Sequence, residues 1–220
     1  MPNGRLIIES PKSGSLNMAT DEALMRLVEE PVLRLYRWAE SAVSIGYFQS
    51  WLEAPKDRPF VRRYTGGGLV DHAKDLTYSL ILPKGHPLDA RGTASSYQAI
   101  HEAVAEALKR EGFQADVVPV ADPEENAACF QRAVKYDVAT GDLKLAGAAQ
   151  RRTKQGTLHQ GSILPPGGYD WDSLAHALEQ TLTPLLASPT IPSQLTEDEH
   201  TLAAELVETR YGTEEWNKQK

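Results

Sequence analysis

Three consecutive glycines, Gly66 to Gly68, follow the run Val61-Arg62-Arg63-Tyr64-Thr65 and lie between two segments with the composition of β-strands. A main chain without Cβ atoms lets another group approach the backbone closely. A phosphate-binding loop needs Gly-Lys-Ser/Thr, or the spaced pattern G-x-G-x-x-G, at the start of a helix, and neither pattern fits these glycines. The run therefore predicts either a close-approach site for something other than a phosphate, or a wide turn or bulge between strands.

Composition restricts the class of protein. The 220 residues are enough to bury a substantial core, and they predict one domain over residues 1–220. No apolar run approaches the roughly 18 residues of a membrane span, and Leu6-Ile7-Ile8 follow the N-terminus without a secretory signal, so we expect a cytoplasmic protein with no membrane segment. A net charge of -7 argues against a nucleic-acid partner. The single cysteine, Cys129, excludes an intrachain disulfide and a metal site built on thiolates.

Four segments have the apolar periodicity of helices. They are Asn17 to Glu29, Ser95 to Glu111, Trp171 to Leu186, and a last helix that ends near Tyr211 and begins at a capping box formed by Thr196 and Glu199. Asp21 and Glu22 are expected in the first turn of the first helix, where the helix dipole favours anions. The proline-rich stretch Pro184 to Pro192 is expected to be a surface connection.

Strand candidates lie between these helices. They are Leu6 to Ile8, Leu33 to Trp38, Ala42 to Tyr47, Val61 to Tyr64, Leu76 to Leu82, Ala115 to Val120, Tyr136 to Ala139, Lys144 to Gln150 and His159 to Leu164. Strands and helices do not alternate strictly. This order favours an α+β domain with a mixed, mostly antiparallel sheet and packed helices.

Several motifs together resemble a known family. Four motifs are similar, in order and spacing, to successive motifs of the lipoate/octanoate transferase and ligase family. They are Leu16-Asn17-Met18-Ala19-Thr20-Asp21-Glu22-Ala23-Leu24, Ser44-Ile45-Gly46-Tyr47-Phe48-Gln49, the glycine run with Arg62 to Thr65, and Lys144-Leu145-Ala146-Gly147-Ala148-Ala149-Gln150-Arg151-Arg152. His159-Gln160-Gly161-Ser162-Ile163-Leu164 continues the likeness. The resemblance covers almost the whole chain and implies the fold of the biotin and lipoate ligase catalytic domains.

The resemblance also implies the substrate and the residues that bind it. In this family the glycine loop and the Lys144 segment form the walls of a tunnel for an eight-carbon acyl chain. The substrate-binding residues that it implies here are Arg62, Arg63, Thr65, Gly66, Gly67, Gly68, His72, Gly147, Ala148 and His159. No metal site is expected.

Two chemistries occur within the family, and Cys129 distinguishes them. Ligases activate a free acid with ATP and Mg, whereas transferases take the acyl group from a thioester onto an enzyme cysteine. Ala128-Cys129-Phe130 is similar to the cysteine segment of LipM-type octanoyltransferases, and the Gly-Arg-Asn-Asp of typical ligases is absent. We therefore expect Cys129 and Lys144 to be catalytic, with no cofactor. ATP-using members generally need an additional C-terminal domain or a partner chain, and the sequence after the last helix leaves no room for such a domain.

The chemistry suits these residue types. A thiolate exchanges with a thioester at little free-energy change, and a nearby ammonium from Lys144 would lower the thiol pKa and stabilise the oxyanion. The acceptor lysine must be neutral to attack, and Lys144 after losing its proton, His72 or His159 could serve as the base. The expected partners are an octanoyl acyl carrier protein as donor and a lipoyl-domain protein as acceptor. An ATP-dependent lipoate-protein ligase, with an accessory subunit, and a non-catalytic binding module remain as alternatives.

Three departures from the family pattern bear on the site. Gln131 to Asp137 replaces the usual Pro-Ser-x-Tyr-Glu segment after the cysteine, and the loop that continues the glycine run, residues 69–75, is close to the family pattern but not identical. His159-Gln160-Gly161 replaces a motif that usually ends in Gln-His-Gly or His-His-Gly, and a displacement by one residue on a strand moves the imidazole to the other face of the sheet. A small basic patch of Arg151, Arg152 and Lys154 is expected to be a solvated face or a dock for an acidic carrier protein.

Overall fold

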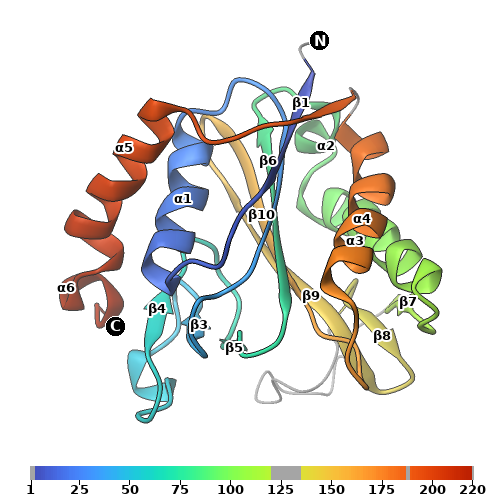
Figure 1. Cartoon of the computed structure of the whole chain (residues 1–220), viewed down its shortest axis with the longest axis horizontal. Coiled ribbons are helices and arrows are strands. Elements are labelled where there is room, and N and C mark those ends of the chain that lie inside the picture. The colour runs from blue at the N-terminus through green and yellow to red at the C-terminus, as the bar shows by residue number, and fades with distance from the viewer. Residues whose placement is uncertain (1–2, 120–134, 187–188, 220) are drawn as a thin grey trace.

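A computed structural model of the chain describes residues 3–119, 135–186 and 189–219. A twisted main sheet runs through the middle of the molecule, with helices on both of its faces (Figure 1). Helices α1 (Gly14–Arg26) and α5 (Glu197–Leu206) pack against each other on one face, and α3 (Thr93–Arg110) and α4 (Trp171–Leu182) pack against each other on the other. This architecture confirms the α+β expectation.

The main sheet has eight strands in the order β11-β1-β2-β6-β10-β9-β8-β7. Their bounds are β1 Gly4–Ile8, β2 Val32–Tyr36, β6 Leu76–Pro83, β7 Asp116–Val117, β8 Val138–Thr140, β9 Leu143–Arg152, β10 Gly156–Ile163 and β11 Thr190–Pro192. Strand β1 runs parallel to β2 and to β11, and every other neighbouring pair is antiparallel. The sheet is therefore mixed and mostly antiparallel, as the sequence predicts.

A second, three-stranded sheet was not expected from the sequence. It consists of β3 (Val43–Ile45) between β4 (Phe60–Arg62) and β5 (Val70–Asp71), with β3 parallel to β4 and antiparallel to β5. Strand β5 has only two residues, too few for a period-two pattern to reveal it. The glycine loop joins β4 to β5, so it does connect strand to strand.

The remaining helical segments are short. They are α2 (Pro87–Ala90), α6 (Glu214–Asn217), the 3-10 turns η1 (Trp51–Glu53) and η2 (Thr183–Leu186), and the π-helical turn η3 (Val207–Tyr211) that continues α5. The capping box of Thr196 and Glu199 is present at the start of α5, as predicted. The expected surface connection from Pro184 to Pro192 is wrong in part, because η2 occupies its first half and β11 pairs with β1 in its second.

The first helix begins earlier than its sequence pattern predicts. Ser13 caps α1 by accepting a hydrogen bond from the Leu16 N–H, and the helix begins at Gly14, three residues before the predicted start at Asn17. Asp21 and Glu22 are therefore in the middle of the helix, and their expected place in its first turn is wrong. Both carboxylates are completely buried, so partners other than the helix dipole must stabilise them.

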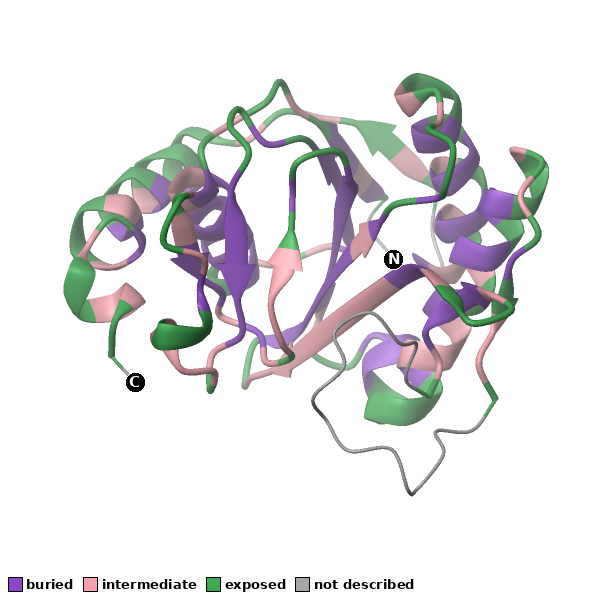
Figure 2. Cartoon of the chain, turned by 90° about the horizontal axis from the view of Figure 1, so that it is seen from below, coloured by how far each residue is buried: buried purple, intermediate pink, exposed green. Residues whose placement is uncertain are grey.

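Strand β6 shows why a period-two pattern is incomplete in this sheet. Every residue from Leu76 to Leu82 is buried, because helices cover both faces of the strand (Figure 2). Tyr78, Leu80 and Leu82 belong to the core beneath α3 and α4, whereas Ile81 belongs to the core beneath α1. Thr77 and Ser79 share the second face and are hydrogen bonded there to buried carboxylates.

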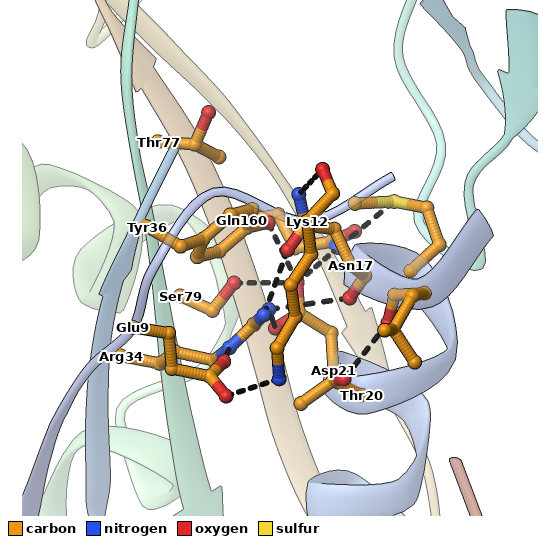
Figure 3. A network of polar contacts seen from close by, with 12 residues as sticks. Glu9, Lys12, Asn17, Thr20, Asp21, Arg34, Tyr36, Thr77, Ser79 and Gln160 are labelled. Atoms are coloured by element: carbon orange, nitrogen blue, oxygen red, sulfur yellow. Dashed lines mark hydrogen bonds and ion pairs between the residues drawn. The ribbon is translucent and has the colours of Figure 1, made fainter. Parts of the chain in front are cut away.

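A buried polar network centred on Asp21 joins α1 to the sheet (Figure 3). One oxygen of this carboxylate accepts from Arg34 Nη1 at 2.7 Å, and the other accepts from Tyr36 Oη at 2.9 Å, Ser79 Oγ at 2.7 Å and Gln160 Nε2 at 2.6 Å. Arg34 also contacts Glu9 through Nε at 2.5 Å. Burial opposes the charge on Arg34, but the two carboxylates outweigh that effect and raise the pKa of Arg34.

Among the described residues, no helix combines the length and the apolar character that crossing a bilayer would require.

Removing the cation from this network should destabilise the fold strongly. Arg34→Met leaves the Asp21 carboxylate buried without a counter-charge, which costs about 3–5 kcal/mol of unfolding free energy. Urea unfolding followed by circular dichroism measures the loss. Arg58→Met is the matched control, because the Arg58–Asp71 pair is at the surface and is worth only about 0–1 kcal/mol. Equal stabilities for the two variants would contradict this account of the network.

Candidate functional site

The glycine loop is held by close backbone contact. Gly67 adopts a φ of +83°, which side chains disfavour. Its carbonyl packs against Gly46, where a Cβ atom would lie only 1.8 Å from the Gly67 oxygen. On its other side, a Cβ on Gly67 would lie 3.5 Å from the Cβ of Ala149 in β9. The loop and the strand that carries Lys144 are therefore adjacent, as the resemblance implies for the two walls of the acyl tunnel.

Arg63 fixes the conformation of this loop. Its Nη2 donates to the carbonyls of Gly66 at 3.0 Å and Gly68 at 2.6 Å, and its Nη1 donates to the carbonyl and the hydroxyl of Ser44. Burial lowers the pKa of Arg63 to about 10, so the guanidinium stays charged at neutral pH. All of these hydrogen bonds from Arg63 go to oxygen atoms of the protein itself.

Arg62 has a comparable role on the other side of β4. Its Nη1 donates to the Gly46 and Gln49 carbonyls at 3.0 and 2.6 Å, and its Nη2 donates to the Asn217 carbonyl at 3.0 Å. The side chain is fully buried and ties the loop after β3 to α6. Contact of Arg62 and Arg63 with a substrate stays a prediction, and their contacts within the protein are structural.

Thr65 links the glycine loop to the network around Asp21. Its hydroxyl donates to Gln160 Oε1 at 2.7 Å, while Gln160 Nε2 donates to Asp21. Gln160 was not among the predicted site residues. Its neighbour His159 points to the opposite face of the sheet, which confirms that a displacement by one residue on β10 moves the imidazole away from the loop.

Lys144 is held by a carboxylate that the sequence did not single out. Its Nζ lies 2.7 Å from Asp137 Oδ2, and the Asp137 side chain is 1% exposed. The Tyr97 hydroxyl donates to Asp137 Oδ1 at 2.9 Å and accepts from the Ala148 N–H at 3.0 Å. The lysine can fold over β9 because Gly147 has no side chain, since a Cβ there would lie 2.5 Å from Nζ. The result is an ammonium in a fixed position at the start of β9, with Gly147 and Ala148 as its support.

His159 lies in the interior of the protein, beneath α3. Its Nε2 is 3.1 Å from the Tyr78 hydroxyl and its Nδ1 is 3.0 Å from Gln150 Nε2, and the ring is fully buried. Burial holds the pKa of His159 well below its usual value, and the ring of His101 at 5.6 Å adds to this effect. An imidazole with both nitrogens occupied and no access to solvent cannot take a proton from a substrate amine.

His72 belongs to a second buried cluster. Its Nδ1 is 2.8 Å from Asp75 Oδ2, its Nε2 is 2.7 Å from Ser44 Oγ, and its ring stacks on Trp38 at 3.8 Å between centroids. These contacts have the connectivity of a Ser-His-Asp triad. However, Ser44 is fully buried and accepts a hydrogen bond from Arg63, so its hydroxyl has no route to a substrate carbonyl.

A cavity of about 930 Å³ brings two of the predicted residues together. Lys144 and His72 both line it, with Trp38, Asp75, Tyr169 and Trp171 among the other lining residues. The glycine loop does not line this cavity. Cys129 lies outside the described residues, in the segment between β7 and β8.

The proposed basic patch is largely engaged within the protein. The Arg151 guanidinium lies over the Tyr64 ring at 4.0 Å, and Arg152 donates to the Asp89 carbonyl at 2.6 Å and to Ser96 Oγ at 2.8 Å. Of the three residues, only Lys154 is exposed. A dock for an acidic carrier protein on these three residues is therefore poorly supported.

The buried histidines make stability depend on pH. Burial lowers the pKa of His101 to about 4, whereas an unfolded histidine titrates near 6.5. The unfolded chain thus binds more protons than the folded chain in this range, and the contribution of His101 to the unfolding free energy is lost as pH falls from about 6.5 to about 4. We expect His101→Gln to remove up to about 3 kcal/mol of this decrease, at about 1.4 kcal/mol per pH unit.

Urea unfolding of His101→Gln and the wild type between pH 7 and 4.5 tests this expectation. Carboxylates with a lowered pKa, such as Glu9, lose their contribution only below their usual value of 4.5. His176→Gln is the control, because that ring is 67% exposed. Parallel pH profiles for His101→Gln and the wild type would show that His101 does not cause the decrease.

Comparison with known proteins identifies the family. Residues 13–184 match the model of the lipoyl protein ligase A/B catalytic domain. An octanoyltransferase LipM of Brevibacillus brevis is 32% identical, with 99% of each chain covered. An octanoyltransferase LipM of Macrococcus caseolyticus is 40% identical over 67% of this chain, and that match spans 60% of the relative's length.

Solved structures agree with this match. A putative lipoate protein ligase from T. acidophilum with bound lipoic acid has a TM-score of 0.85 and 27% identity, with both chains fully covered. Lipoate-protein ligase A bound with ATP has a TM-score of 0.83 and 27% identity, with 99% of each chain covered. The glycine loop, the Lys144 strand and the fold that holds them side by side are thus those of a known family, and this chain belongs to the lipoyl protein ligase A/B catalytic domain family.

Proposed function

We propose that this chain is an octanoyltransferase of lipoate assembly, which moves an octanoyl group from an acyl carrier protein to a lysine of a lipoyl-bearing protein through a thioester on Cys129. Relatives that are 32–40% identical carry the name octanoyltransferase LipM, and they support octanoyl transfer over ATP-dependent ligation. The structural observation that carries the proposal is the ammonium of Lys144, which Asp137 holds on β9, the same strand that contacts the glycine loop through Ala149. A lipoyl donor in place of the octanoyl donor would use the same residues.

In the first half-reaction, the Cys129 thiolate attacks the carbonyl carbon of the donor thioester. The bond from that carbon to the carrier sulfur breaks, and the carrier leaves as a thiol after taking a proton. Lys144 would stabilise the negative charge that develops on the carbonyl oxygen. Since the energy of one thioester is kept in the next, this step needs no ATP.

In the second half-reaction, a neutral acceptor amine attacks the Cys129 thioester. The carbon–sulfur bond breaks, an amide forms, and the proton lost by the amine is balanced by the cysteine sulfur that regains one. Asp137 holds the Lys144 ammonium in one position, so Lys144 is better suited to stabilise the oxyanion than to act as a mobile base. His159 is too deeply buried for that task, and both ring nitrogens of His72 are occupied by Asp75 and Ser44, so we propose the leaving thiolate as the acceptor of the proton.

ATP-dependent lipoate ligation is the second candidate. The solved structures that cover this whole chain at 26–28% identity are named as lipoate protein ligases, and one of them is described as a bi-partite ligase. A chain of this kind acting with a partner subunit would use free acid and ATP in place of a carrier thioester.

Intact-mass measurement separates the two activities. We expect wild-type protein incubated with octanoyl carrier protein, without ATP, to gain one octanoyl group that hydroxylamine removes. Cys129→Ser should gain no hydroxylamine-sensitive adduct and should not transfer octanoyl to a lipoyl domain. If Cys129→Ser instead modifies the lipoyl domain with free acid and ATP as fast as the wild type, the ligase reading is correct and the thioester route is wrong.

The contact between Asp137 and Lys144 makes a separate prediction. Asp137→Asn removes the charge that orients the ammonium, and it should lower kcat by about 10- to 100-fold, or about 1.4–2.8 kcal/mol, with little change in KM. Tyr97→Phe should lower kcat less, because the Asp137 carboxylate still holds the lysine.

Rescue by a conservative variant distinguishes positioning from loss of fold. Asp137→Glu, which keeps the negative charge, should recover part of the kcat that Asp137→Asn loses. Asp71→Asn, which alters a surface pair in the same way, should leave kcat unchanged. A reduced melting temperature of Asp137→Asn with an unaltered kcat would mean that Asp137 serves only the fold.

A further inference from the structure

The cavity beside Lys144 is separate from the region expected to hold the acyl chain. It is formed where four segments meet, namely the residues after β2, the turn between β5 and β6, the start of β9 and the connection from β10 to α4. In Figure 1 the turn between β8 and β9 and the connection from β10 to α4 lie together at the lower right of the sheet. Because Lys144 lines this cavity and Gly66 to Gly68 do not, an occupant could reach the ammonium without passing the glycine loop.

The walls of this cavity are amphipathic. Trp38, Tyr169 and Trp171 supply aromatic surface, and Leu143 and Leu164 are 48% and 46% exposed. Large apolar side chains with this exposure are suited to contact with a ligand or a partner. The volume of about 930 Å³ lies within the range of about 300–1,000 Å³ that is common for cofactor and small-molecule sites.

Cations mark the outer part of the cavity. Arg37 and Lys74 both line it and are exposed, and the Arg37 guanidinium lies over the Trp171 ring at 4.2 Å. The carboxylates nearby are Asp75, which is buried and bonded to His72, Asp137, which is buried and paired with Lys144, and Asp172, which is exposed and lies 3.7 Å from Arg37. Positive charge is therefore available to a ligand at the rim, from the exposed Lys74 and from Arg37, whose pair with Asp172 is at the surface.

We propose that this cavity binds the phosphopantetheine arm of the donor carrier protein, with the phosphate between Arg37 and Lys74 and the thioester at Lys144. The arm has a phosphodiester at one end, two neutral amides and a branched apolar segment in its middle, and the thioester at the other end. Those features match, in order, the exposed cations, the aromatic walls and the catalytic ammonium. An acidic carrier protein outside the rim would meet the same two cations and the exposed leucines.

This inference rests on the proposed octanoyl transfer, and binding measurements separate it from that proposal. The affinities of the whole protein for the holo carrier protein and for the apo carrier protein, which lacks the arm, are measured by fluorescence anisotropy. We expect the wild type to bind the holo form about tenfold more tightly than the apo form. Ala73→Trp, which adds a large ring at an exposed lining position, should remove that difference.

A charge variant tests the rim. Arg37→Gln/Lys74→Gln should weaken binding of the holo form about five- to tenfold and reduce its dependence on salt. Lys109→Gln/Arg110→Gln is the matched control, because these two cations lie in the last turn of α3 and are exposed away from the cavity. It should bind both forms as the wild type does.

Three outcomes would overturn the inference. The first is that the wild type binds the holo and apo carrier with equal affinity. The second is that Ala73→Trp keeps the preference for the holo form. The third is that Ala73→Trp loses binding to the lipoyl domain and keeps its binding to the carrier protein. A wild type that binds the holo form through this cavity but is never acylated by the octanoyl form would refute the proposed transfer and leave the binding site standing.

Discussion

The Asp21 carboxylate is the contact on which most of the site depends. It is fully buried in the middle of α1 and accepts hydrogen bonds from three neighbouring strands of the sheet, through Arg34 and Tyr36 on β2, Ser79 on β6 and Gln160 on β10. A charge without water must have such partners, and a geometry that satisfies all of them leaves few alternative positions for the helix. Because the Gln160 amide nitrogen donates to Asp21, the amide oxygen is placed to accept from Thr65. The orientation of this one amide therefore connects the helix to the glycine loop. The net free energy of such a network can be small, but its specificity is high.

The Lys144 site follows the same principle at the far end of the sheet. A lysine on a strand near a sheet edge would ordinarily extend into water. Here Gly147 leaves space above the strand, and Asp137 and Tyr97 fix the ammonium in that space. Tyr97 is itself fixed by the backbone of Ala148, so the two side chains that hold the ammonium are anchored to the main chain of β9. Electrostatic stabilisation is most effective when the charge does not have to reorganise during the reaction, and this arrangement provides that property.

The sequence predicted the larger elements because each of them has a regular apolar face. The start of α1 was misplaced since residues 14–16 add little to an apolar stripe, while Ser13 caps them. Strands β5 and β11 were missed because two or three residues carry no period, and their pairing depends on β3 and β1. The loop and the lysine strand were recognisable from glycines and from motif order. Asp137, Tyr97 and Gln160 were not, because their importance comes from contacts between residues that are 7, 40 and 95 positions apart. Sequence spacing predicts which residues share an element, and it does not predict which elements meet.

The two sides of Lys144 have different chemistry, and the difference has a physical origin. Toward Gly67 and Ala149, the glycine loop and β9 meet through backbone and small side chains, and a Cβ on Gly67 would lie 3.3 Å from the Arg63 guanidinium. Toward Arg37 and Lys74, aromatic walls and exposed cations offer a wide space that suits an amphipathic arm. A thioester joins an acyl chain to such an arm at one carbonyl carbon. Under the proposed function, the fixed ammonium would meet the acyl chain from the side of the glycine loop and the arm from the side of the cavity, so the site would recognise the thioester that joins them.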